Sequence, residues 1–199
     1  MKKTININLG GIVFNIDDDA YIKLKAYLDQ IEIYFSNENE GGEILADIEN
    51  RIAELFQERS KGTGRVIDMK DVDEVIRILG DPEEIGGPEN GQGEHQRKRY
   101  SSKTYRRIYR DPDNRVLGGV CSGISAYWRM DPLILRILFL VSFLGFGIGL
   151  IIYLILWIVI PEARTATQKL EMKGEPVNIS NIGKTVKEEF NNVKNRMNL

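Results

Sequence analysis

The chain has 199 residues, 42% of them hydrophobic, and a formal net charge of −2, which allows one or two small domains. Its charge is uneven: residues 1–86 carry 10 basic and 19 acidic side chains, and residues 87–199 carry 17 and 10. The single cysteine, Cys121, excludes an internal disulfide. The single histidine, His95, has no cluster of metal-ligand side chains around it, so no metal and no cofactor are expected.

The first 85 residues have the pattern of a small α+β domain. Alternating apolar residues at 4–9 and 12–16, separated by Gly10-Gly11, predict a β-hairpin with a primed turn. Apolar stripes at helical spacing then predict three helices, the first after Asp17 and the third capped by Asp68. A two-stranded sheet cannot bury its apolar face alone, so we expect the helices to cover it in one acidic domain, residues 1–85.

A polar, glycine-rich stretch and a basic stretch follow. Residues 86–104 predict a flexible linker that becomes basic at its end. Eight basic residues and three tyrosines lie within 97–115, a composition that suits either an anionic membrane leaflet or nucleic acid. A long apolar run follows, so we favour the membrane and expect Arg106, Arg107 and Arg110 at its interface.

Residues 117–129 predict a short helix lying at the membrane interface. Three glycines there, Gly118, Gly119 and Gly123, would allow close helix packing. Tyr127 and Trp128 suit the level of the lipid headgroups.

The apolar run of residues 137–160 contains no charged side chain. As one helix it would be about 36 Å long, enough to cross a hydrocarbon core of about 30 Å. Asp131-Pro132 would begin the helix and Pro161 would end it, giving a predicted apolar span at 133–160. Within this span Gly145 and Gly149 are predicted helix-packing residues, and Arg136, Tyr153 and Trp157 are predicted membrane-interface residues.

The glycines in the middle of this run leave a second threading open. A re-entrant hairpin could turn at Gly145, Gly147 and Gly149, but each arm would be about 18 Å long, too short to cross. We therefore prefer a single crossing, with residues 1–136 in the cytoplasm.

Residues 110–162 resemble the PspC domain, the domain of phage shock protein C. The first half of the resemblance lies in Arg110-Asp111, the run RVLGGVCSGI at 115–124 and the pair Tyr127-Trp128. The second half lies in Asp131-Pro132, Arg136, the glycines Gly145, Gly147 and Gly149, and the run YLILW at 153–157 before Pro161. It implies an inner-membrane protein of the bacterial envelope-stress response that engages partner stress proteins at the cytoplasmic face. It implies no enzymatic activity.

The last segment, 164–199, begins with a polar stretch. A basic amphipathic helix is predicted to follow it. Its apolar stripe is Ile182, Val186, Phe190, Val193 and Met197. We expect this helix either to dock on the rest of the protein or to lie on a membrane surface.

Together these patterns predict a mainly α protein: an α+β N-terminal domain joined to a helical transmembrane PspC-like domain at 105–163. We expect an envelope-stress signalling scaffold in the bacterial inner membrane, with its N-terminal domain in the cytoplasm. The expected partners are an anionic lipid leaflet, stress-response proteins and further copies of the chain. The alternative is a membrane-tethered transcription regulator using the basic stretch 97–115, although the acidic domain would repel nucleic acid. No phosphate loop, nucleophile elbow or zinc-protease motif is present, so we do not expect an enzyme.

Overall fold

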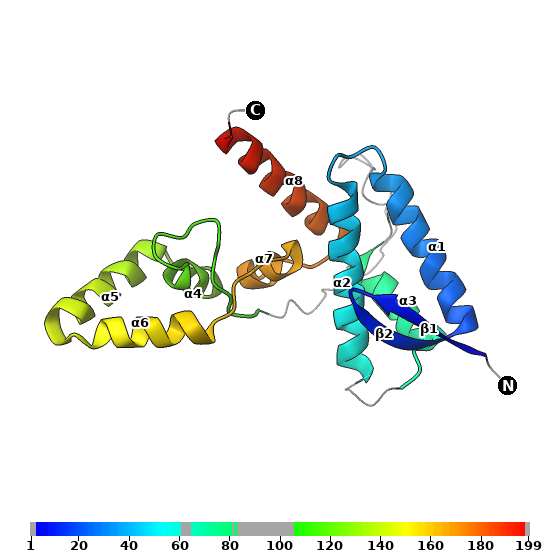
Figure 1. Cartoon of the computed structure of the whole chain (residues 1–199), viewed down its shortest axis with the longest axis horizontal. Coiled ribbons are helices and arrows are strands. Elements are labelled where there is room, and N and C mark those ends of the chain that lie inside the picture. The colour runs from blue at the N-terminus through cyan, green and yellow to red at the C-terminus, as the bar shows by residue number, and fades with distance from the viewer. Residues whose placement is uncertain (1–2, 61–64, 81, 83–105, 198–199) are drawn as a thin grey trace, which may run out of the picture. The chain divides into compact units, whose positions relative to one another are not determined.

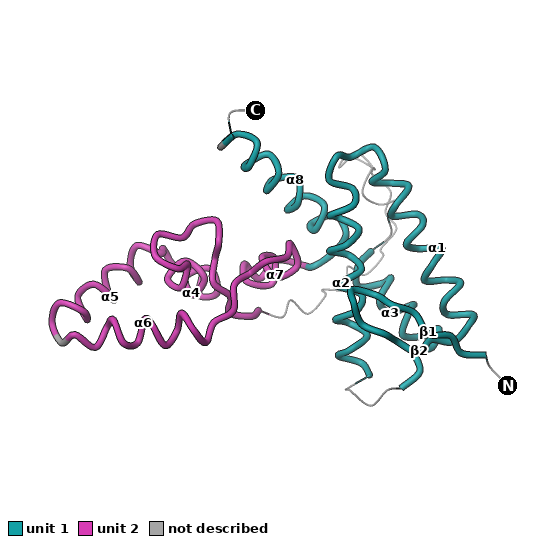
Figure 2. Tube along the Cα trace, in the orientation of Figure 1, with its two compact units in different colours: residues 1–100, 177–199 teal, residues 101–176 magenta. Residues whose placement is uncertain are grey.

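The computed structural model describes residues 3–60, 65–80, 82 and 106–197. The chain divides into two units (Figure 2): unit 1 comprises residues 1–100 and 177–199, and unit 2 comprises residues 101–176. Helices predominate in both, as the sequence predicts (Figure 1). The predicted linker at 86–104 lies outside the described residues, as does the basic stretch up to residue 105.

Unit 1 begins with the predicted β-hairpin. Strands β1 (Thr4–Leu9) and β2 (Ile12–Asp17) pair antiparallel, with Ile7 opposite Phe14. Gly10 and Gly11 both have positive φ, +55° and +80°, as a primed two-residue turn requires. The hairpin and its turn are therefore confirmed.

Three helices cover this hairpin: α1 (Asp18–Phe35), α2 (Gly41–Ser60) and α3 (Met69–Leu79). Phe14 of β2 meets Phe56 of α2 edge to face, with ring centroids 5.7 Å apart. Residues just before α3 extend the pairing, because the Ile67 N–H donates to Asn15 O at 2.8 Å. The core is formed by apolar side chains from all these elements: Ile16, Leu24, Ile31, Ile44, Ile48, Ile52, Ile67, Val72, Val75 and Leu79.

The start of α3 confirms the predicted cap at Asp68. Its carboxylate accepts the backbone N–H groups of Lys70 and Asp71, at 2.9 and 3.1 Å. The buried Asp71 carboxylate accepts the Asp68 N–H in return, which completes a capping box. Arg65 also donates to Asp71, at 2.6 Å, so this buried carboxylate has a cationic partner.

The C-terminal helix α8 (Ile179–Arg196) belongs to unit 1, where its first half packs against α2 and Phe35. Ile179, Ile182 and Val186 are buried. At Gly183 an added Cβ would lie 3.2 Å from the Phe35 ring, so a larger side chain would push α8 away. The second half of the apolar stripe, Phe190, Val193 and Met197, stays exposed.

Unit 2 consists of α4 (Val120–Trp128), α5 (Pro132–Phe146), α6 (Ile148–Val159) and α7 (Ala166–Lys173). The Asp131 carboxylate caps α5 by accepting the Leu133 N–H at 2.8 Å, and Pro132 is the first helical residue, as predicted. α5 and α6 lie side by side and antiparallel (Figure 1).

The predicted transmembrane helix is wrong. Among the described residues no helix is both long and apolar enough to cross a membrane. The span predicted at 133–160 is interrupted at Gly147, whose φ of +68° ends α5 and begins α6. The two helices have 15 and 12 residues, about 22 and 18 Å, so neither matches a hydrocarbon core of about 30 Å.

Two glycines explain why the hairpin prevails over a continuous helix. Gly147 takes the left-handed conformation at little cost, and its N–H still donates to Phe143 O at 3.0 Å. One residue therefore makes the reversal, and its own N–H group stays paired. At Gly149 an added Cβ would lie 2.7 Å from the Phe143 nitrogen and 2.8 Å from the Phe139 oxygen. Only glycine allows α6 to approach α5 this closely.

The hairpin predicts unequal effects of two glycine substitutions. Gly149→Leu should destabilise unit 2 by about 1–3 kcal/mol, because the new side chain meets the α5 backbone. Gly145→Leu should leave the stability unchanged or raise it, because an added Cβ there has nothing within 4 Å. Thermal unfolding in detergent micelles measures both. Equal losses of stability in the two variants would contradict the antiparallel packing.

The docking of α8 gives a second prediction. Ile182→Ala should weaken the attachment of α8 by about 2–5 kcal/mol, because Ile182 is fully buried. Hydrogen exchange of the α8 amides should then speed up accordingly. The matched control is Val193→Ala, which alters an exposed residue of the same helix and should change exchange little. Unchanged α8 protection in the Ile182 variant would argue against the docked position.

Candidate functional site

Unit 2 carries a large exposed apolar surface on α5 and α6, here called the apolar hairpin surface. Leu144 and Ile158, for example, are 74% and 79% exposed. Monomeric soluble proteins rarely expose contiguous apolar patches of more than a few hundred Å². The surface consists of Leu133, Ile134, Ile137, Leu138, Leu140, Val141, Phe143, Leu144, Ile148, Leu150, Ile151, Ile152, Leu154, Ile155, Trp157, Ile158 and Val159. An exposed apolar surface of this extent has the character of an interaction site.

Arg110 closes the base of this hairpin. Its backbone N–H donates to Pro161 O at 2.8 Å, and its carbonyl accepts the Ala163 N–H at 3.0 Å. Its guanidinium donates to Ile160 O at 2.9 Å and to Gly118 O at 3.1 Å. The same group lies 5.8 Å from the centre of the Trp157 ring. The chain therefore enters and leaves the hairpin at one end.

Of the three glycines at and just before the start of α4, two lie against the backbone of residues 109–111 and one lies against α6. A Cβ on Gly123 would collide with the Tyr109 carbonyl, and one on Gly119 would collide with the Asp111 carbonyl. A Cβ on Gly118 would lie 2.7 Å from the Trp157 ring. These three residues let residues 109–111 and α6 pack directly on the start of α4.

Of the two predicted helix-packing glycines in the hairpin, the structure gives only one a close neighbour. Gly149 is buried against α5, whereas Gly145 is exposed beside open space. The pair therefore does not form one contact face within unit 2.

The loop before α4 positions Arg136. The buried Asp111 carboxylate accepts the backbone N–H groups of Asp113 and Asn114, at 2.9 and 3.3 Å. This holds Asn114 so that its carbonyl accepts a hydrogen bond from the Arg136 guanidinium at 3.1 Å. Arg115 in the same loop pairs with Glu162 at 3.6 Å.

The other predicted interface residues have mixed surroundings. Arg106 donates to Tyr127 O at 3.3 Å, and Arg107 lies 3.9 Å from the Glu171 carboxylate of α7. Tyr127 is half-buried, and Trp128 is exposed at the end of α4. Tyr153 donates its hydroxyl to the Leu117 carbonyl, and its ring meets Phe139 edge to face.

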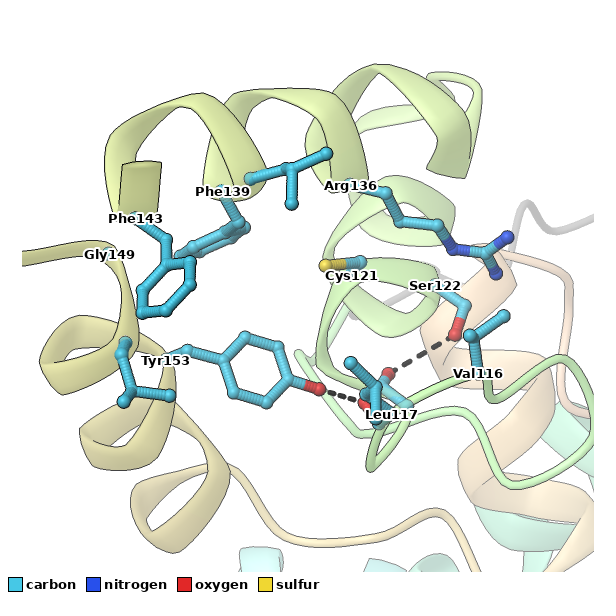
Figure 3. A pocket seen from close by; sticks show the side chains of 12 residues that line it. Val116, Leu117, Cys121, Ser122, Arg136, Phe139, Phe143, Gly149 and Tyr153 are labelled. Carbon is cyan, nitrogen blue, oxygen red and sulfur yellow. Dashed lines mark hydrogen bonds between the residues drawn. The ribbon is translucent and has the colours of Figure 1, made fainter. Parts of the chain in front are cut away.

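A cavity of about 460 Å³ opens between the loop, α4 and the hairpin (Figure 3). Arg136 lies at its edge, and Phe139 and Phe143 follow along the same face of α5. Cys121 points into it from α4, and burial raises the pKa of this thiol despite the nearby Arg136 charge.

Sequence patterns missed several residues of this site. Glu171 is buried and accepts the Tyr109 hydroxyl at 3.2 Å; burial and this negative charge raise the pKa of Tyr109. Glu171 lies in a segment without apolar periodicity, which hides its role. A signal for Val116 and Leu117 does exist, because two apolar residues interrupt a polar loop there, and both are exposed beside the cavity. Within the described part of the chain no three potential ligands gather as a metal site.

Comparison with known proteins places one family on this unit. Residues 106–163 match the model of the PspC domain, so this part of the chain is a PspC domain, as the resemblance indicated. The domain belongs to a phage-shock-type stress-response family, whose members are generally membrane-associated. No curated protein and no solved structure matches the chain significantly.

The contacts of Arg110 predict a specific loss of stability. Arg110→Lys should destabilise unit 2 by about 1–3 kcal/mol, because an ammonium group cannot reach both carbonyls in the fixed geometry of a guanidinium. Arg115→Lys is the control and should change stability by less than about 0.5 kcal/mol, since its ion pair is exposed. Denaturant unfolding measures both free energies. Equal losses of stability in the two variants would contradict the role of the two Arg110 side-chain hydrogen bonds in closing the hairpin base.

Proposed function

With residues 106–163 a PspC domain, we propose that the protein is a stress-response scaffold held at one face of the bacterial plasma membrane by the α5–α6 hairpin. In this proposal the hairpin enters the leaflet from the cytoplasmic side and does not cross it. The N-terminal domain then recruits partner stress proteins through protein–protein contacts. The observation that carries the proposal is the apolar hairpin surface.

The energetics favour lipid as the covering for this surface. Its side chains are roughly half exposed, and full burial of one such side chain is worth about 1.5–3 kcal/mol. Covering all of them with acyl chains is therefore worth on the order of 10 kcal/mol. The backbone within each helix satisfies its own hydrogen bonds, so only the polar groups at the reversal, where α5 ends and α6 begins, lack intrahelical partners.

The base of the hairpin has the chemistry of a membrane interface. Arg110, Arg115 and Arg136 supply positive charge there, and Trp128 and Trp157 supply amphipathic rings. The pairing of Arg110 with Pro161 and Ala163 supports a topology in which both flanking segments emerge on the same side of the membrane.

Signalling in this proposal works through the packing of the hairpin. Bilayer stress that alters the contact at Gly149 would alter the base at Arg110, and hence the two chain segments that lead to unit 1. The acidic domain then presents a different surface to its partners or to a second copy. For the transcription-regulator alternative, no observation of the described residues adds support: Arg107, Arg110 and Arg115 all have partners within unit 2.

Vesicle flotation of the full chain tests the membrane contact. The wild type should float with vesicles of phosphatidylethanolamine and phosphatidylglycerol. Leu144→Asp combined with Ile151→Asp should abolish flotation, because both residues lie near the reversal and each carboxylate would enter the hydrocarbon at about 2.5–3.5 kcal/mol.

The matched control is Ile33→Asp on α1, where Ile33 is 72% exposed but belongs to unit 1. This variant should float as the wild type does. A wild type that stays with the soluble fraction, or a double variant that still floats, would refute membrane contact through the hairpin. Crosslinking in native membranes, with and without residues 1–96, then identifies the partners of the N-terminal domain.

A further inference from the structure

The cavity beside the hairpin is elongated and has charge at one end only. Arg136, Phe139 and Phe143 follow one another on one face of α5, so the wall runs about 10 Å along the helix from the guanidinium toward the turn. Leu140, Leu150 and Tyr153 complete the apolar part. Its volume of about 460 Å³ is within the usual range of small-molecule sites, about 300–1,000 Å³.

The polar side chains of the wall are already engaged within the protein. The Tyr153 hydroxyl donates to Leu117 O, and the Ser122 hydroxyl donates to Gly119 O at 3.3 Å (Figure 3). The Cys121 thiol is half-buried and holds its proton, because burial raises its pKa. A ligand would therefore meet apolar surface along most of the length of the cavity.

Arg136 is the exception. A guanidinium has five N–H donors, and one of those of Arg136 is used, in the bond from Nη2 to Asn114 O at 3.1 Å. Among the described residues no carboxylate lies within ion-pair distance of it. The remaining donors suit an anion with several oxygens, such as a phosphate group.

We propose that this cavity binds a single anionic phospholipid, with one acyl chain along Phe139 and Phe143 and the phosphate on Arg136. The inference rests on the proposed membrane contact in one respect: the lipid comes from the leaflet that receives the hairpin.

The orientation of the bound lipid agrees with that contact, because Arg136 lies one turn from the base of α5 and Phe143 lies near the reversal at Gly147. Headgroup and chain would then lie at the depths they occupy in the bilayer.

Native mass spectrometry of the full chain tests this site. The protein, purified in mild detergent, is offered equal amounts of phosphatidylglycerol and phosphatidylcholine. The wild type should retain one phosphatidylglycerol in preference. Arg136→Gln should weaken retention of both lipids, because the charge-assisted hydrogen bonds to the phosphate are lost. It should also lower the preference about tenfold, because the choline cation of phosphatidylcholine no longer meets a positive charge. Arg129→Gln removes an exposed charge outside the cavity wall and should keep the preference.

A second pair of variants tests the acyl-chain part. Leu140→Trp fills the cavity and should reduce retention of both lipids, whereas Leu138→Trp, which changes an exposed residue outside the wall, should not. Equal losses of lipid retention in the two arginine variants or in the two tryptophan variants would overturn the site.

The lipid site and the membrane contact can fail separately. Wild type that floats with vesicles yet retains no lipid would overturn the site, while leaving the membrane contact intact. Retention of phosphatidylglycerol without flotation would support the cavity and refute the membrane contact.

The single cysteine gives a test in the unmodified chain. Bound phosphatidylglycerol should slow the alkylation of Cys121 by N-ethylmaleimide, measured near the ordinary thiol pKa of about 8.5. Protection of the same size by dodecanoate would assign the cavity to free fatty acids and overturn the phospholipid. Protection that grows with protein concentration in the absence of lipid would show that a second copy covers the cavity.

Discussion

The left-handed backbone at Gly147 determines the form of unit 2. Because one residue reverses the chain, two short helices replace one long one, and Gly149 lets them pack backbone against backbone. Both ends of the apolar run then meet at one place, where Arg110 can hydrogen-bond to Ile160 and to the loop at Gly118. A continuous helix would have placed these ends about 36 Å apart, and no base of this kind would exist.

The base and the reversal have opposite chemistry, and this gives the hairpin a direction. Near the base, polar groups hold one another through hydrogen bonds, from Asp111 to the loop backbone and from Arg136 to Asn114 O. Toward the reversal charged side chains are absent, whereas exposed apolar side chains run along the whole hairpin, from Leu133 and Ile158 at the base to Leu144 beside the turn. An uncharged apolar length with charge at one end only matches the change from headgroup to hydrocarbon, which an apolar patch without a charged end would not do.

Much of the fold could be predicted from local signals. Gly10-Gly11 between alternating runs, Asp68 before α3 and Asp131-Pro132 before α5 each act within a few residues, so the sequence carries them directly. The reversal was harder, because uniformly apolar residues on both sides of Gly147 give hydropathy no way to separate one helix from two. The close contact between Gly149 and the α5 backbone favours two helices over one. This contact forms only when the chain folds back on itself, so no local sequence signal predicts it.

The candidate site was predictable to a similar degree. Composition identified the apolar run and the arginines around it. Neither the cavity nor the buried pair of Tyr109 and Glu171 follows from spacing, because each joins residues distant in the chain. The same holds for α8. Its stripe predicts an amphipathic helix, but only the structure distinguishes the docked half at Ile182 from the exposed half at Val193.

The chain order of α7 and α8 connects the proposed membrane contact to the N-terminal domain. α7 packs with α4 in unit 2, and α8 packs with α2 in unit 1, yet only residues 174–178 separate them. A change at the hairpin base that shifts α7 would therefore pull on α8, whose hold on unit 1 depends on few buried side chains, Ile182 foremost. Detachment of α8 would expose the apolar surface of α2 and Phe35, and this offers a physical route from bilayer stress to a new protein-binding surface.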